Sequence, residues 1–146
     1  ALASEILNTD VITSATKILQ ADYDVVLLEG AGGLLVPITE QLLTLDYIAD
    51  KGYPVILVTS GRLGSINHTL LSLETIKSRG LDVHSVIYNH IHDNAAQTDE
   101  QIATSTIKFL QNYLAEHHPT AHWLALPVQE DNGFSHTDFI LPQNFV

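Results

Sequence analysis

The sequence predicts an α/β domain with a largely parallel sheet and flanking helices, and three observations carry this prediction. Short, continuously apolar and partly β-branched runs recur along the chain, as in strands that are buried on both faces of a sheet. Segments with apolar residues at helical spacing separate these runs. The connections are short, so the strands should pair in parallel, and their carboxyl ends should meet at one edge of the sheet.

Four elements are expected in the first part of the chain: a helix over residues 1–20, a strand over 24–28, a loop or edge segment over 34–38 and a short helix over about 42–51. Asp10 is a candidate N-cap of the first helix. Pro37 argues against a central strand, because proline cannot donate to a sheet ladder. Gly52 is expected to end the short helix as its C′ residue.

The remaining elements alternate regularly: a strand over 55–59, a helix from the turn at 60–68 to about residue 79, a strand over roughly 83–88, a helix from about residue 98 and a strand over 123–126. Gly80 should end the first of these helices. Its inner stripe is expected to consist of Leu70, Leu73, Ile76 and Lys77, with the aliphatic stem of Lys77 at the margin. Pro119 lies beyond the end of the second helix. We find no linker or internal repeat.

Composition limits the possible functions. The 146 residues suffice for one domain with a hydrophobic core, so we expect a single α/β domain over residues 1–146. No apolar run reaches the roughly 18 residues that a membrane-spanning helix needs. The formal net charge of −11 argues against nucleic acid and anionic membranes as partners. The absence of cysteine excludes thiol chemistry, and cytoplasm is the default location.

The stretch Glu29-Gly30-Ala31-Gly32-Gly33 follows the first predicted strand and is a candidate ligand site. Glycines allow backbone amides to approach a phosphate or an oxyanion, and positive φ costs them little. A carboxylate is a hard oxygen ligand that suits Mg²⁺. The alternative is a simple chain turn with Glu29 as a solvated loop residue.

Two further turns should lie at the same edge of the sheet. Gly64-Ser65-Ile66-Asn67 opens a helix, whose free amides and dipole favour a carboxylate or a phosphate. Ordinary capping by Ser65, with Asn67 exposed, is the alternative. Asn89 could offer the donor and acceptor that an adenine edge needs, or it could be a turn asparagine.

The histidines offer weaker hypotheses. His90 and His92 could share a face, but Zn²⁺ normally needs a third ligand, for which Asp93 is the only neighbour, so a metal role is disfavoured. His68 lies in a first helical turn and is expected to be neutral and structural. His117 and His118 are expected to cap the end of their helix.

Taken together, these motifs closely resemble the dethiobiotin synthetase family. The residues that carry the resemblance are Asp24 to Gly33, Val36-Pro37-Ile38, Pro54 to Val58, Leu63 to His68, and Asn89. The resemblance implies a P-loop NTPase-like, three-layer α/β fold and a homodimer. It also implies an ATP- and Mg²⁺-dependent ligase that closes a ureido ring on 7,8-diaminononanoate with CO₂, in biotin biosynthesis.

The resemblance also implies roles for individual residues. Glu29 would bind Mg²⁺, and Gly30, Gly32 and Gly33 would lie beside the carbamate and the γ-phosphate. The helix start, formed by Leu63, Gly64, Ser65, Ile66 and Asn67, would hold the substrate carboxylate across the dimer interface. Asn89 would contact adenine, and the loop from Pro127 and Val128 onward would close over the base.

The chain departs from the family pattern in three ways. No G-x-x-x-x-G-K-[ST] element occurs, and methionine is absent even at position 1, so we expect the P-loop to lie on an upstream segment and the chain alone to be inactive. Glu100-Gln101-Ile102 stands where the family presents an aromatic residue to the substrate. Leu124-Ala125-Leu126 precedes Pro127 where the family tends to carry glycine, an acid and an aliphatic residue.

Three functions are therefore compared. The first is the carboxyl-terminal portion of a dethiobiotin synthetase. The second is a non-catalytic relative without a P-loop that acts as an anion-binding or interaction module. The third is another P-loop ligase that forms amides on a similar sheet. A P-loop after a strand in the upstream sequence would favour the first function, and a natural start near Ala1 would favour the second.

Overall fold

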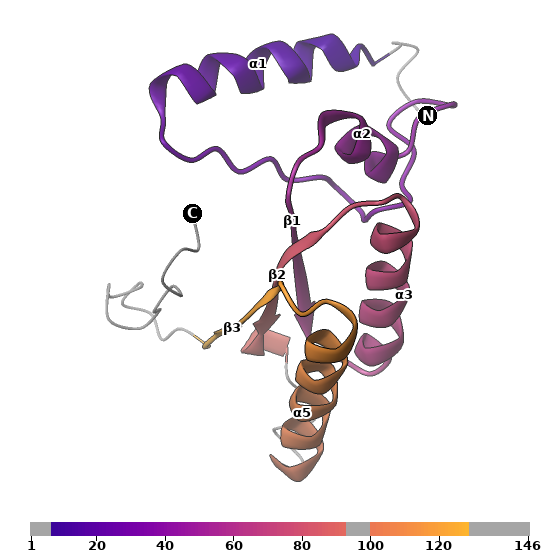
Figure 1. Ribbon diagram of the computed structural model, residues 1–146, viewed down its shortest axis with the longest axis vertical. Coiled ribbons are helices and arrows are strands. Elements are labelled where there is room, and N and C mark those ends of the chain that lie inside the picture. Colours follow the sequence, from indigo (N-terminus) through magenta and orange to yellow (C-terminus); the bar gives the residue numbers. More distant parts are fainter. Residues whose placement is uncertain (1–6, 93–99, 129–146) are drawn as a thin grey trace. The chain divides into compact units, whose positions relative to one another are not determined.

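The computed structural model describes residues 7–92 and 100–128, and its elements are labelled in Figure 1. The chain divides into two compact units, one up to Lys51 and one from Gly52 onward, and each is considered by itself. The second unit contains a parallel sheet with flanking helices, which confirms the predicted α/β class. Among the described residues, no helix has the length and apolar character needed to cross a membrane.

The sheet of the second unit has three parallel strands in the order β1-β2-β3. Their bounds are Val55–Ser60 for β1, Val83–Asn89 for β2 and His122–Leu126 for β3. In the ladder, Ser60 pairs with Asn89 and Asn89 with Leu126. The last residues of all three strands are therefore side by side, as predicted for the edge that carries the unusual turns.

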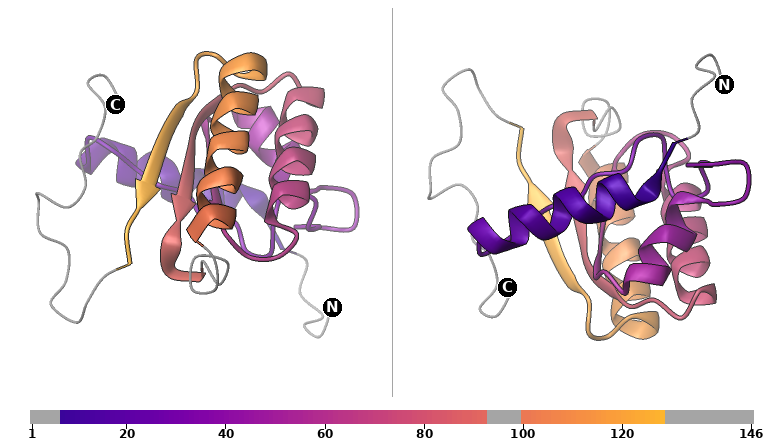
Figure 2. Two further views of the ribbon diagram at one scale, coloured as in Figure 1. Left: turned by 90° about the horizontal axis from the view of Figure 1, so that it is seen from below. Right: turned by 90° about the horizontal axis from the view of Figure 1, so that it is seen from above.

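Two long helices cover one face of this sheet, α3 (Ser65–Ser78) and α5 (Glu100–His117), and a short 3₁₀ helix, η1 (His90–His92), follows β2 (Figure 2). The predicted inner stripe of α3 is confirmed at Leu73 and Ile76, which are buried, whereas Leu70 is half-buried and Lys77 is exposed. Leu110 and Leu114 of α5 are buried in the same way. The α5 start predicted near residue 98 falls outside the described residues.

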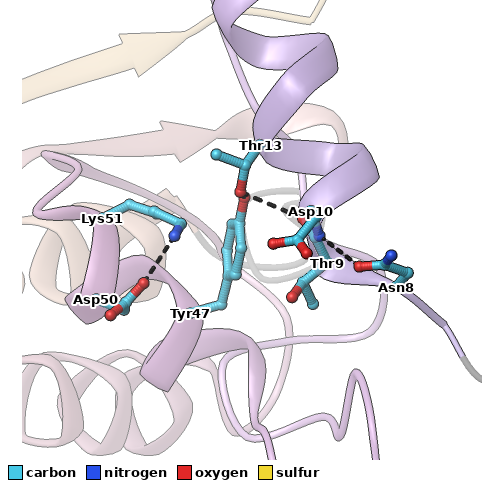
Figure 3. A network of polar contacts seen from close by, with 7 residues as sticks. All are labelled: Asn8, Thr9, Asp10, Thr13, Tyr47, Asp50 and Lys51. Atoms are coloured by element: carbon cyan, nitrogen blue, oxygen red, sulfur yellow. Dashed lines mark hydrogen bonds and ion pairs between the residues drawn. The ribbon is translucent and has the colours of Figure 1, made fainter.

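The first unit contains α1 (Thr9–Asp22) and α2 (Thr44–Lys51). The N-cap prediction for α1 is wrong: Asn8 is the cap, and its side-chain oxygen accepts a hydrogen bond from the backbone N–H of Asp10 at 2.9 Å (Figure 3). Asp10 instead lies in the first turn, where its charge complements the helix dipole. The part of the predicted helix before residue 7 falls outside the described residues.

A buried tyrosine joins the two helices of this unit. Thr13 Oγ1 lies 3.0 Å from the hydroxyl of Tyr47 and donates its own hydrogen to Thr9 O, so Tyr47 is the donor in the pair (Figure 3). Gly52, with φ of +65°, follows α2 at the predicted C′ position. Pro37 makes only an isolated antiparallel bridge with Leu43, which confirms the loop or edge prediction for residues 34–38.

The strand predicted over residues 24–28 is wrong. This segment makes no strand ladder with the described residues, and Leu27 is 78% exposed to solvent. An apolar run becomes a strand only when neighbouring backbone satisfies its N–H and C=O groups. The described part of the chain supplies no such neighbour to this run.

Candidate functional site

A cleft of about 470 Å³ lies at the carboxyl end of β1 and β2, within the second unit. Its lining includes Leu63 from the turn before α3, Ser65 at the start of α3, and Asn89 from the end of β2. The structure therefore brings together residues from two of the turns that the sequence singled out. Pro127 and Val128 follow β3 at the same edge of the sheet.

The amino terminus of α3 carries free backbone donors. Gly64 is the N-cap, with φ of +87°, and it supplies no side-chain cap. The N–H of Ser65 donates to Arg62 O at 2.9 Å, whereas the amides of Ile66 and Asn67 have no acceptor in the described part of the chain. Capping by Ser65 is therefore wrong, because Ser65 is the first helical residue. The side chain of Asn67 is exposed, as that alternative expected.

The charge of the cleft favours an anion. The cation Arg62 lines it, and the described lining residues include no aspartate or glutamate. This is notable in a chain with only six Lys and Arg residues and a net charge of −11. Arg62 is not among the predicted site residues, although a cation beside a glycine turn at the edge of a sheet could have indicated it.

Asn89 is a turn asparagine, which was the alternative to adenine recognition. Its side-chain oxygen accepts a hydrogen bond from the N–H of Ile91 at 3.0 Å, at the start of η1. The side-chain NH₂ has no acceptor among the residues described. Asn89 therefore keeps two free donors at the mouth of the cleft, while its oxygen shapes the chain that follows β2.

The turn Glu29 to Gly33 lies in the first unit. Glu29 is exposed and makes no hydrogen bond or ion pair with any residue that the structure describes. Gly32 and Gly33 have φ of +88° and +123°, and a Cβ at Gly30 would lie 3.0 Å from Thr44 Cγ2. The glycines are thus required by conformation and space, and a carboxylate without a partner fits a divalent cation.

The remaining histidines have structural surroundings. The ring of His90 packs edge-on against Tyr88 at 4.8 Å, and no group of three potential metal ligands occurs in the described ranges. Asp93 falls outside those ranges. The ring of His117 lies 4.3 Å from that of Tyr113, whereas His118 is buried, and this burial lowers its pKa.

Comparison with known proteins identifies the family. A family model described as an AAA domain matches residues 1–131. The chain is 53% identical over 108 residues to the ATP-dependent dethiobiotin synthetase BioD 2 of Pasteurella multocida (strain Pm70), covering 74% of this chain and 49% of that protein. It is 46% identical over 132 residues to the protein of the same name from Haemophilus ducreyi (strain 35000HP), covering 88% and 61%.

A third relative, the ATP-dependent dethiobiotin synthetase BioD of Chlorobaculum tepidum, is 53% identical over 95 residues, which cover 65% of this chain and 38% of that protein. The chain thus spans about half the length of the curated relatives that it matches. These relatives confirm the resemblance to dethiobiotin synthetases, and the family model establishes that the chain belongs to the AAA domain family.

Proposed function

We propose that the chain is part of an ATP-dependent dethiobiotin synthetase that closes the ureido ring of dethiobiotin from 7,8-diaminononanoate and CO₂. The observation that carries this proposal is the 53% identity over 108 residues to a protein of that name. The anion-favouring cleft at the start of α3 supports it, because diaminononanoate ends in a carboxylate.

The proposed reaction has three steps. One substrate amine attacks CO₂ and loses a proton, which gives a carbamate. The carbamate oxygen then attacks the γ-phosphorus of ATP, and ADP leaves. Finally the second amine attacks the carbamoyl carbon and loses a proton, phosphate leaves and the ring closes. Each step develops negative charge on oxygen, which fixed N–H dipoles and cations stabilise.

We propose that the start of α3 binds the substrate carboxylate. The amides of Ile66 and Asn67 lack acceptors in the described chain, and they point from the positive end of a helix dipole. The side chain of Asn67 adds an amide, and Arg62 supplies positive potential to the cleft. The resemblance to dethiobiotin synthetases implies that this contact crosses the interface of a homodimer, and we propose the same arrangement for this protein.

We propose that Glu29 binds Mg²⁺, while the backbone at Gly30, Gly32 and Gly33 lies beside the carbamate and the γ-phosphate. The unpaired carboxylate and the two positive φ angles support these roles. Mg²⁺ would neutralise charge on the phosphate oxygens. For the nucleotide, we propose that Asn89 contacts adenine through its free NH₂ donors and that Pro127 and Val128 begin the loop over the base.

The chain contains no G-x-x-x-x-G-K-[ST] element, which cradles phosphates in nucleotide-binding proteins of this kind. We therefore propose that turnover requires an additional segment that carries a P-loop. The 146-residue chain should have no synthetase activity by itself, and we propose that residues 1–146 belong to a single α/β domain.

The test is formation of dethiobiotin by the full-length protein, measured by mass spectrometry with diaminononanoate, bicarbonate, ATP and Mg²⁺. We expect one ADP per dethiobiotin, and no product when any component is omitted. Asn67→Ala should mainly raise the KM for diaminononanoate. Absence of product, with diaminononanoate still bound, would favour the non-catalytic anion-binding module. ADP formation with a different amine and carboxylate would favour another ligase.

A further inference from the structure

We propose that Thr59 and Thr69 are positioning residues, which fix the first turn of α3 so that its amides face the substrate carboxylate. The substrate in this inference rests on the proposed function, whereas the hydrogen-bonded geometry does not. Neither threonine belongs to the motifs that carry the family resemblance.

The two hydroxyls form a relay from β1 to α3. Thr69 Oγ1 donates to Ser65 O at 2.7 Å, one turn earlier in the helix. Thr59 Oγ1 lies 2.6 Å from Thr69 Oγ1. Because the single hydroxyl hydrogen of Thr69 is directed at Ser65, Thr59 must be the donor to Thr69. The relay therefore has one direction, from the end of the strand to the first carbonyl of the helix.

The relay compensates for weak apolar packing at this end of α3. The buried residues of the helix are, in order, Ser65, Thr69, Leu73 and Ile76, so the half nearest the cleft is buried through hydroxyl residues. Thr59 and Thr69 are only 8% and 4% exposed, which shields their hydrogen bonds from water. By contrast, Leu63 in the preceding turn is fully exposed, so its side chain does not hold the start of α3 against the sheet.

The relay controls the proposed binding group because Ser65 C=O and Ile66 N–H belong to one peptide unit. A peptide unit is planar, so fixing the direction of its oxygen also fixes the direction of its N–H. A hydrogen bond to the carbonyl also polarises the unit and strengthens its N–H as a donor. Thr69 thus aims and strengthens the Ile66 amide, and Thr59 holds Thr69 in place.

The test compares variants of the full-length protein. Thr69→Val and Thr59→Val remove one hydroxyl each with little change in shape, and Thr69→Ser keeps the hydroxyl. Thr75→Val is the matched control, because Thr75 Oγ1 also donates one turn back, to Leu71 O, outside the cleft. Two quantities are measured: hydrogen exchange of the His68 amide, which donates to Gly64 O, and the KM values for diaminononanoate and ATP.

We expect both valine variants at 59 and 69 to accelerate exchange at His68 and to raise the KM for diaminononanoate roughly three- to tenfold, the worth of one hydrogen bond. The kcat and the KM for ATP should change little, and Thr69→Ser and Thr75→Val should resemble the wild type. Unchanged exchange at His68 would overturn the relay whatever the activity.

Faster exchange with an unchanged KM for diaminononanoate would overturn the positioning role, as would a parallel rise in the KM for ATP. If the wild-type protein forms no dethiobiotin, the proposed function fails separately. In that case the exchange data still decide the relay, and the calorimetric Kd for diaminononanoate decides whether the relay affects binding.

Discussion

The molecule contains two glycine turns that look alike in sequence and differ in structure. The turn at Gly64 follows β1, which is paired with β2, and the threonine relay ties it to the strand. The turn at Glu29 to Gly33 follows an extended run without a strand ladder, in which Leu27 is largely exposed. Both turns have glycines with positive φ, so the local conformation is set in each.

The difference teaches that a short motif determines local chemistry, whereas its placement depends on neighbouring elements. Gly32 and Gly33 can adopt their φ values, and Glu29 can remain unpaired, without help from a sheet. A turn that binds a ligand at a defined position also needs a paired strand before it and a fixed helix after it. The turn at Gly64 has both, in β1 and α3.

The largest effect is expected at the first turn. Glu29→Gln in the full-length protein should lower kcat by about a hundredfold or more, because the proposed Mg²⁺ would lose its anionic ligand and would stabilise the transition state less well. Thermal stability should be unchanged, since Glu29 has no partner among the described residues. Steady-state ADP release is the measurement, and Glu40→Gln, an exposed carboxylate in the same unit, is the control. An unchanged kcat would remove the metal role.

The second turn should respond in both binding and stability. Gly64→Ala should lower the free energy of unfolding by about 1–2 kcal/mol, because alanine resists the left-handed φ of +87°. Gly80→Ala is the matched control at the other end of the same helix, with φ of +69°. Both variants should lose stability in a denaturant titration, but only Gly64→Ala should raise the KM for diaminononanoate. Equal KM values for diaminononanoate in the two variants would contradict a role of this turn in substrate binding.

A smaller effect is expected between the two helices of the second unit. Tyr113 donates to Glu74 at 2.6 Å, which lowers the pKa of Glu74 and raises the pKa of Tyr113 to about 12. Between pH 10 and about 12 the native state holds more protons than the unfolded state, so stability should fall as pH rises. Unfolding curves of the wild type and of Tyr113→Phe test this, and an equal slope in the variant would contradict it.

The smallest effect is expected at His118. Its burial lowers its pKa, and Lys77 acts in the same direction while Glu74 opposes it. The unfolded state therefore binds the proton more readily, and stability should fall as pH decreases from about 6.5 through the lowered pKa. His118→Gln should reduce this acid sensitivity, measured by thermal unfolding from pH 7 to 5. The neighbouring exposed His117→Gln should retain it.

Much of the second unit was predictable because its signals are local. Apolar runs located all three strands, and Gly80 located the end of α3. The misses depend on contacts that sequence patterns do not contain. Thr59 and Thr69 meet across ten residues and different elements, and Asn8 replaced Asp10 as a cap because its oxygen reaches the amide two residues on. The single domain over residues 1–146 and the roles of the site residues remain predictions.

The most direct test of the central claim, that each turn binds one of the proposed substrates, is amide NMR of the full-length protein. Diaminononanoate should shift the amide signals of Ile66 and Asn67. A non-hydrolysable ATP analogue with Mg²⁺, added next, should shift those of Gly30, Gly32 and Gly33. The account would be contradicted if neither the helix amides nor the glycine amides shifted. It would also be contradicted if the same amides shifted equally in a double variant with Asn67→Ala and Glu29→Gln.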